Sequence, residues 1–248
     1  MWPTYKTLRM MLSHIRHIFR KDTTNIKQAL YSFTANQDPG SKEMSLTSRN
    51  GWWVPDTDRV ALPIILREVK DLQEMLPLCK QKRRVIQAGG NVGIWPKELS
   101  RHFDNVITFE PDPLNYRALV KNVGDIDNIH FHHLALGERY GTGSMDRVDP
   151  GNIGAHQIKE GKEFKIVSID SFGFDDVDFI QLDVEGFEHF AVCGAMETIE
   201  RTSPVICLEL KGIGNRYGHP DEDTINLLES IGYTIRCRIH RDIVFVRN

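Results

Sequence analysis

The sequence lacks several features that would place the protein in a specialised class. None of its four cysteines forms a Cys-x-x-Cys pair, and no Cys/His spacing indicates a zinc site. Three of the four lie in apolar segments, so we expect buried free thiols in a reducing compartment rather than disulfides. No apolar run approaches the length of a membrane span, and the net charge of −3 gives no overall attraction for nucleic acid. These absences favour a cytoplasmic protein, with nucleic acid disfavoured as a partner.

The N-terminal segment has a basic, amphipathic pattern. Residues 1–35 are predicted to be helical, and no acidic residue stands between Lys6 and Lys21, where apolar residues recur at helical spacing. We expect an amphipathic helix that packs on the domain. The alternative is peripheral membrane contact through residues 5–21.

A loop is predicted over residues 36–58, which are rich in turn formers. Its adjacent Trp52 and Trp53 either anchor the loop to the core or form a wall or lid of a binding site. Asp58 is the expected N-cap of the helix that follows the loop.

Strands and helices are predicted to alternate over the rest of the chain. Strands are expected at 84–88, 106–110, 129–134, 177–183 and 205–210, and helices at 58–79, 94–103, 113–123, 187–200 and 221–231. Residues 137–168 resemble an insertion of loops with a short hairpin, and 233–238 and 243–246 form a last hairpin. The alternation predicts an α/β fold, a mostly parallel, doubly wound seven-stranded sheet with a C-terminal antiparallel hairpin. We expect this domain at 81–248, after an N-terminal helical extension and Trp-containing loop at 1–80.

A glycine-rich turn, Gly89 to Gly93, follows the first of these strands, and the second strand ends at Glu110, 21 residues after Gly89. This spacing is typical of a βαβ unit whose acidic residue accepts hydrogen bonds from ribose hydroxyls. Glycines are missing at positions 91 and 94, which disfavours an NAD(P)-linked oxidoreductase, and no Gly-Lys-Ser/Thr phosphate loop is present. The turn suits a cofactor without a pyrophosphate, such as S-adenosylmethionine.

Carboxylates end two neighbouring strands. Asp183 and Glu209 are expected to face each other at the carboxyl edge of the sheet, with Glu185 just beyond. Such a group can act as a general base, since nearby like charges raise one member's pKa. Alternatively, Asp183, Glu185 and Glu209 bind Mg²⁺, or Glu185 only favours the positive N-terminus of the next helix.

Several motifs carry a family resemblance, in order from residue 84 to 247. They are Gly89-Gly-Asn-Val-Gly, Phe109-Glu-Pro-Asp-Pro-Leu-Asn, Ala135-Leu-Gly-Glu, Ser168-Ile-Asp-Ser, Asp183-Val-Glu-Gly-Phe-Glu, Pro204-Val-Ile-Cys-Leu-Glu and Gly232-Tyr. Together they resemble the FkbM-type family of S-adenosylmethionine-dependent methyltransferases. The resemblance implies a Rossmann-like class I methyltransferase fold and methyl transfer, typically to a hydroxyl oxygen of a sugar or another small molecule.

The resemblance also assigns roles to residues. The turn around the methionine part of the cofactor would be Gly89, Asn91 and Gly93, the ribose ligand Glu110, and the adenine neighbours Ala135 and Leu136. Gln87, Gly90, Pro111 and Asp183 complete the predicted cofactor-binding set. The family usually carries an acidic residue at the position of Gln87, which brings no charge.

Other functions remain open from the sequence. Asp183, Glu209 and Glu185 are the predicted catalytic residues, and the acceptor is expected between Asp183, Glu209, the 137–160 insertion and the Trp52-Trp53 loop. One alternative is an RNA ribose methyltransferase that uses Asp183 and Lys211. Another is a catalytically inactive domain that binds a cofactor or a partner.

Overall fold

The computed structural model describes residues 45–247. The predicted helix at 1–35, including the basic segment 5–21, lies outside the described residues. In the part of the chain that the structure describes, no helix is long and apolar enough to cross a membrane.

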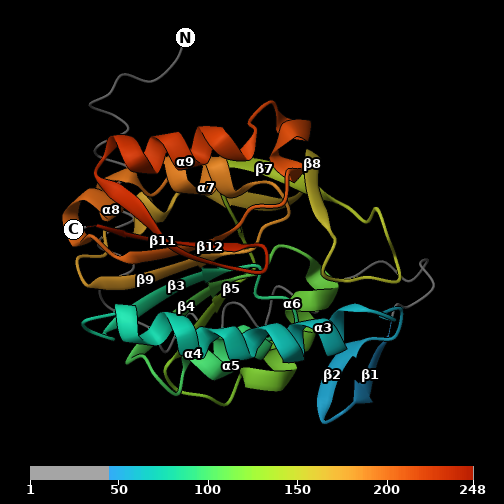
Figure 1. Ribbon diagram of the computed structural model, residues 1–248. Helices are drawn as coiled ribbons and strands as arrows, with labels where there is room; N and C mark the ends of the chain where they lie inside the picture. Colours follow the sequence, from blue (N-terminus) through green and yellow to red (C-terminus); the bar gives the residue numbers. More distant parts are fainter. Residues whose placement is uncertain (1–44, 248) are drawn as a thin grey trace. The chain divides into compact units, whose positions relative to one another are not determined.

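A seven-stranded sheet forms the centre of the fold, in the order β11-β12-β10-β9-β3-β4-β5 (Figure 1). Its strands are β3 (Arg84–Ala88), β4 (Asn105–Phe109), β5 (Ile129–His132), β9 (Val177–Leu182), β10 (Val205–Glu209), β11 (Tyr233–Ile239) and β12 (Asp242–Arg247). The first five are parallel, and β12 runs antiparallel to both β10 and β11. The predicted doubly wound sheet with its C-terminal hairpin is therefore confirmed. Because β4 and β9 flank β3 on opposite sides, the crossover direction reverses at β3, where open α/β sheets bind ligands.

Helices cover both faces of this sheet (Figure 1). One face carries α7 (Glu188–Cys193), α8 (Met196–Thr202) and α9 (Asp221–Ser230), and the other carries α3 (Ala61–Glu68), α4 (Leu72–Met75), α5 (Ile94–Leu99) and α6 (Pro113–Val123). Successive strand residues point to opposite faces. Ile86 accordingly packs in the core beneath α7 to α9, whereas Val85 packs in the core beneath α4 to α6.

The predicted insertion contributes β7 (Gly141–Asp146) and β8 (Gln157–Val167) to a second, three-stranded sheet, and β6 (Ala135–Leu136), just before the insertion, completes it. The expected hairpin is the antiparallel β7–β8 pair, and β6 joins it in parallel. Between β7 and β8, residues 147–156 form a loop, and short 3₁₀ turns follow at Ile169–Phe172 and Ile213–Tyr217.

The predicted loop at 36–58 is wrong over its second half, where β1 (Leu46–Arg49) and β2 (Trp52–Pro55) form an antiparallel hairpin. Its two-residue turn, Asn50 and Gly51, has φ angles of 51° and 79°. Asn and Gly tolerate positive φ, and an Asn-Gly pair is the preferred two-residue turn of a hairpin.

The hairpin is fastened to α6. The Trp53 amide donates to Asn122 Oδ1 and the Asn122 side chain donates to the Trp53 carbonyl, both at 2.8 Å. The Lys121 ammonium lies 3.2 Å from the centre of a Trp53 ring. Trp53 thus anchors the hairpin to the domain.

The helix expected at 58–79 is confirmed as α3 and α4 with the 3₁₀ turns Val69–Asp71 and Leu76–Leu78. Helix α3 begins at Ala61 and its N-cap is Val60 rather than Asp58, but the Asp58 carboxylate still accepts hydrogen bonds from the first helical amides, those of Ala61 (3.0 Å) and Leu62 (3.1 Å), and so caps the helix. Ala61 and Leu62 are buried in one cluster with Val92 and Ile94. The core therefore continues across the domain boundary predicted at residue 80.

Candidate functional site

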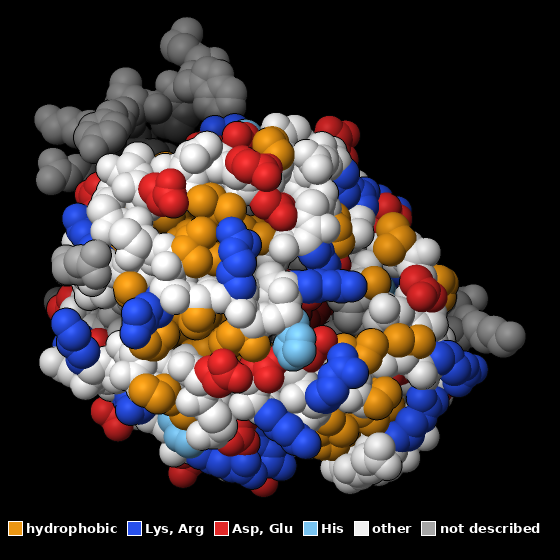
Figure 2. Space-filling view, in the orientation of Figure 1, with side chains coloured by type: hydrophobic (Ala, Val, Ile, Leu, Met, Phe, Trp, Pro, Cys, Tyr) orange, Lys and Arg blue, Asp and Glu red, His pale blue; other side chains and the backbone are white. Residues whose placement is uncertain are grey.

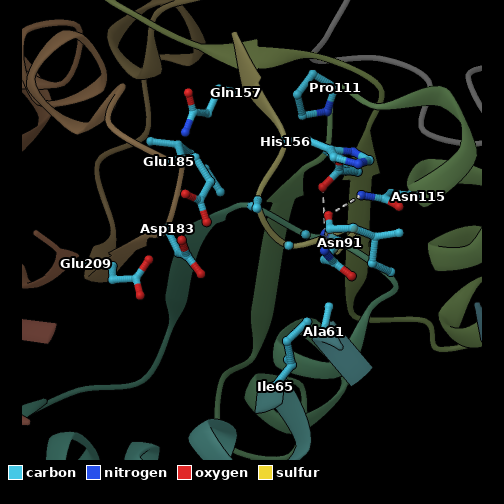
Figure 3. Close-up of a pocket in the computed structure, with 18 of the residues that line it drawn as sticks. Ala61, Ile65, Asn91, Pro111, Asn115, His156, Gln157, Asp183, Glu185 and Glu209 are labelled. Carbon is cyan, nitrogen blue, oxygen red and sulfur yellow. Dashed lines mark hydrogen bonds between the residues drawn. The ribbon is translucent and has the colours of Figure 1, made fainter. Parts of the chain in front are cut away.

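A cavity of about 310 Å³ opens at the carboxyl ends of the parallel strands. Its walls come from the turn after β3, the ends of β4, β9 and β10, helix α3 and the loop before β8 (Figure 3). Figure 2 shows this face hollowed beside the tip of the β11–β12 hairpin, with acidic side chains in the hollow.

The glycine turn is held close to two neighbouring strands. The amides of Gly89 and Gly90 both donate to the Phe109 carbonyl of β4, at 3.1 and 2.9 Å. Gly89 has a φ of +83°, and a Cβ at this position would lie 1.9 Å from the Asp183 carbonyl oxygen. Only glycine lets the backbone approach the end of β9 so closely.

Gln87 lies behind the turn, is fully buried and does not line the cavity. Its amide nitrogen donates to the carbonyl oxygens of Ala88 and Gly89, each at 3.1 Å, and its oxygen accepts from the Thr108 hydroxyl. An ionised carboxylate has no hydrogen to donate to those carbonyls. Gln87 thus stabilises the turn from behind rather than facing a cofactor.

Most of the predicted cofactor residues do line the cavity. They are Gly89, Gly90, Asn91, Glu110, Pro111, Ala135, Leu136 and Asp183, whereas Gly93 and Gln87 lie outside the lining. Gly93, with a φ of +94°, begins α5 and packs against Val123, so its role is to turn the chain into the helix.

Glu110 is buried and lies under the glycine turn. One of its oxygens accepts the Asn91 amide at 2.7 Å and the other accepts the Asp112 amide at 2.8 Å. Burial, together with the charge of Asp112, raises the pKa of Glu110 to about 8. A carboxylate offers about four acceptor positions, so each oxygen keeps one for a hydroxyl group in the cavity.

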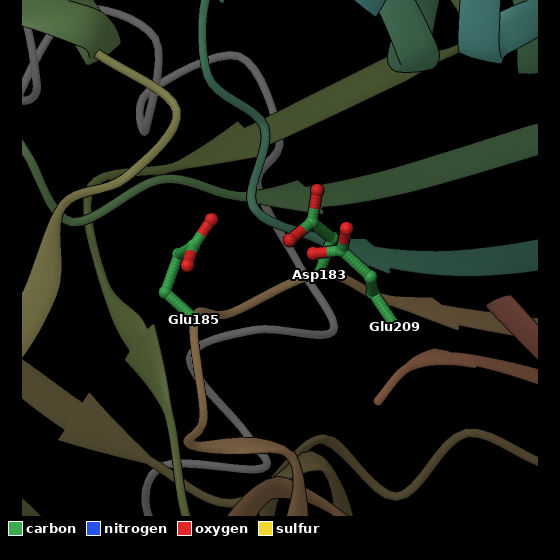
Figure 4. A group of neighbouring side chains, drawn as sticks. All are labelled: Asp183, Glu185 and Glu209. Carbon is green, nitrogen blue, oxygen red and sulfur yellow. The ribbon is translucent and has the colours of Figure 1, made fainter. Parts of the chain in front are cut away.

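Three carboxylates meet beyond the glycine turn, as the sequence predicts. Asp183, Glu185 and Glu209 each offer an oxygen within 4.8 Å of those of the other two (Figure 4). Lys211 lies among them. Its ammonium donates to Glu185 Oε1 at 2.8 Å and also to Glu209 Oε2.

The pKa values of Asp183 and Glu209 are shifted in opposite directions. Burial and the charge of Glu209 raise the pKa of Asp183 well above its usual value. Burial acts on Glu209 in the same direction, but the hydrogen bond from Asp183 and the charge of Lys211 outweigh it, and the pKa of Glu209 is lowered. These opposite directions correspond to a pair in which Asp183 holds its proton more tightly than Glu209 and donates a hydrogen bond to it. The Asp183 Oδ1 is buried and has no hydrogen-bond partner in the described part of the chain.

One wall of the cavity was not predicted, helix α3 with Ala61, Ile64 and Ile65. The 137–160 insertion does line the cavity as expected, and the loop before β8 contributes Ile153. The Ile153 carbonyl accepts from the side-chain amides of Asn91 (3.0 Å) and Asn115 (3.1 Å) (Figure 3). The spacing of the apolar residues in α3 indicates that one face is buried, but nothing in the sequence indicates what this face covers.

Neither Trp52 nor Trp53 lines the cavity, so the predicted tryptophan wall is wrong. Both side chains belong to a hairpin that packs on α6, and Lys97 and Lys121 lie over their rings. The structure supports the other interpretation of the pair, anchoring to the core.

Comparisons with known proteins give one family. The model of the methyltransferase FkbM domain matches residues 87–235. No curated protein matches the chain.

Several solved structures are similar in fold. A methyltransferase FkbM from Methylobacillus flagellatus KT is 20% identical with a TM-score of 0.47, and the match covers 66% of this chain and 43% of that one. The chain therefore spans less than half the length of that protein. The magnesium protoporphyrin IX methyltransferase of Synechocystis PCC 6803 is 12% identical, with a TM-score of 0.43 and coverage of 96% and 97%. The N-methyltransferase NodS of Bradyrhizobium japonicum WM9 is 11% identical, with a TM-score of 0.44 and coverage of 75% and 95%.

Proposed function

This chain belongs to the family of methyltransferases with an FkbM domain, and from that premise we propose that it transfers a methyl group from S-adenosylmethionine to a hydroxyl oxygen of a sugar or another small molecule. The observation that carries the proposal is one cavity that holds both the glycine turn and the carboxylates Asp183 and Glu209. The turn suits the cofactor, and the carboxylates suit removal of a hydroxyl proton.

The residues of the cavity fit this cofactor. Glu110 would accept hydrogen bonds from the ribose hydroxyls through its remaining acceptor positions. Ala135 and Leu136 would pack beside the adenine, and the backbone at Gly89 and Gly90 would enclose the methionine part. When bound, the cofactor supplies an electrophilic methyl group on a positively charged sulfur.

The acceptor hydroxyl must lose its proton as its oxygen attacks the methyl carbon. Asp183 is the base in our proposal, because this residue lines the cavity and its buried Oδ1 has no hydrogen-bond partner among residues 45–247. Its pKa, raised by burial in the empty site, would fall beside a bound cation. Asp183 would then release its own proton to solvent, and the ionised carboxylate would accept the hydroxyl proton.

Mg²⁺ fits this site poorly. The Lys211 ammonium already lies between Glu185 and Glu209, two of the three predicted ligands. We therefore derive no step through a metal ion. The RNA alternative has little support, because Lys211 is the only lysine among the described residues that line the cavity, and two carboxylates engage it.

The first test is a calorimetric titration with S-adenosylmethionine, with NAD as a control ligand. We expect the wild type to bind S-adenosylmethionine and not NAD, and Glu110→Ala to lose binding because the ribose ligand is gone. If the wild type does not bind S-adenosylmethionine, the inactive-domain alternative takes the place of this proposal.

The second test compares Asp183→Asn with Glu188→Gln in a methyl-transfer assay over a panel of hydroxylated acceptors. Loss of a general base costs about 10²- to 10⁴-fold in rate, so we expect a loss of that size in Asp183→Asn with cofactor binding retained. Glu188 is a buried carboxylate outside the cavity that accepts the Val184 amide at 2.9 Å. Glutamine can still accept that bond, so Glu188→Gln should keep its activity. Full activity in Asp183→Asn would contradict the assigned role.

A further inference from the structure

Lys211 contacts two of the three clustered carboxylates, and all the groups concerned are largely enclosed. The exposed fractions of the Lys211, Glu185 and Glu209 side chains are 15%, 9% and 14%. The Lys211 ammonium lies 2.8 Å from Glu185 Oε1 and also donates to Glu209 Oε2, and two adjacent carboxylates favour the charged form of an amine. The ammonium is therefore charged, and it is the cation nearest to these carboxylates.

The backbone is strained where it brings Glu185 to Lys211. Glu185 has a φ of +55°, a left-handed conformation that residues other than glycine adopt at a cost. The next residue, Gly186, also has a positive φ, and a Cβ on it would lie 2.9 Å from the Ile213 carbonyl carbon. The loop after β9 thus packs tightly on the loop after β10, and this contact holds the Glu185 carboxylate against the Lys211 ammonium.

We propose that Lys211 is the built-in cation of this site. Its ammonium lies where a divalent metal ion would otherwise bind Glu185 and Glu209, and it positions Glu209 to accept a hydrogen bond from Asp183. The bridging ammonium makes the site independent of metal. Only the last part, the positioning of Asp183 for proton transfer, rests on the proposed function.

Other charged groups surround the cluster and do not replace Lys211. Arg241, in the β11–β12 turn, contributes positive charge to Glu185 and Glu209 but makes no ion pair with either within the described residues. Asp242 and Glu68 add negative charge near Glu209. Removal of Lys211 would therefore leave an excess of carboxylates, the ligand type that binds Mg²⁺ and Mn²⁺.

The test is a calorimetric titration with Mn²⁺, without S-adenosylmethionine or acceptor. Lys211→Ala should gain saturable Mn²⁺ binding at least about tenfold tighter than the wild type, since ligand charge sets the affinity of oxygen sites. Lys211→Arg keeps the positive charge and should not gain binding. Adding Glu185→Gln to Lys211→Ala should remove the gain. Mn²⁺ should also raise the melting temperature of Lys211→Ala and leave that of the wild type unchanged.

Two results would overturn the inference. One is Mn²⁺ binding by the wild type that Glu185→Gln abolishes, and the other is a folded Lys211→Ala variant that binds no Mn²⁺. If Lys211→Ala does not fold, the double variant Lys211→Ala with Glu185→Gln decides. Removing the Glu185 charge should restore folding if Lys211 neutralises that charge. Failure to restore folding would refute the role of Lys211 as the cation of the site. None of these measurements uses methyl transfer, so their failure is distinct from failure of the proposed function.

Discussion

The close approach of the glycine turn to the end of β9 can be tested by adding one methyl group. A Cβ on Gly89 would lie 1.9 Å from the Asp183 carbonyl oxygen. Real Cβ atoms essentially never come within 3.0 Å of a heavy atom outside their own residue and its two chain neighbours. In Gly89→Ala the two segments must therefore separate by about 1 Å. We place the reacting methyl group between the turn and Asp183, and that movement would pull the two apart.

Gly51 provides a matched control. Its φ of +79° is close to the +83° of Gly89, but nothing lies within 4 Å of a Cβ built on it. Both alanine variants lose about 1–2 kcal/mol for the left-handed conformation. Only Gly89→Ala adds the cost of forced displacement, about 1–3 kcal/mol for an overpacked interior. We expect a total loss of about 2–5 kcal/mol for Gly89→Ala.

Urea denaturation measures the free energy of unfolding of both variants, and calorimetry measures their affinity for S-adenosylmethionine. Gly51→Ala should keep the wild-type affinity, whereas Gly89→Ala should lose it. Equal destabilisation by the two substitutions, or wild-type affinity in Gly89→Ala, would refute the argument that β9 and the turn require this contact.

Two further predictions follow from buried carboxylates. Burial and Asp112 raise the pKa of Glu110 to about 8, and protonation removes an acceptor position, so affinity for S-adenosylmethionine should rise as the pH increases through about 8. Calorimetry across that range should show no such rise for Glu110→Gln. A rise that persists in the variant would assign the effect to another group. Asp58→Ala removes the cap of α3 and should lower the free energy of unfolding in urea by about 0.5–2 kcal/mol. Asp125→Ala, at an exposed position that caps no helix, should change this free energy little. Similar losses in the two variants would show that the cap contributes nothing.

The sheet and its helices could be predicted because their signals are local. Helix α6 occupies the predicted residues 113–123, and β3 the predicted 84–88. Each element has its own apolar periodicity and its own turn formers at the ends, so no long-range information is needed. The meeting of Asp183 and Glu209 was also predictable, since parallel strands bring their carboxyl ends to one edge.

The other walls of the cavity depend on contacts between residues far apart in the sequence. The sequence placed the 137–160 insertion beside the site, but no periodicity specifies that Asn91 and Asn115 both donate to the Ile153 carbonyl and so bring this residue to the glycine turn. The β1–β2 hairpin was missed although Asn50 and Gly51 carry a turn signal, because the flanking four-residue runs are short and β2 has no clear alternation.

The charge of the cluster follows from the same geometry and bears on the choice of substrate. Three carboxylates within 4.8 Å of one another cannot all stay ionised without compensation. The Lys211 ammonium offsets one of them, and burial together with the charge of Glu209 favours a proton on Asp183, so the three carboxylates and the ammonium together stay negative. A negative site attracts a cationic sulfonium and repels phosphate groups. These electrostatics support our proposal of S-adenosylmethionine as the cofactor and of an uncharged hydroxylated acceptor.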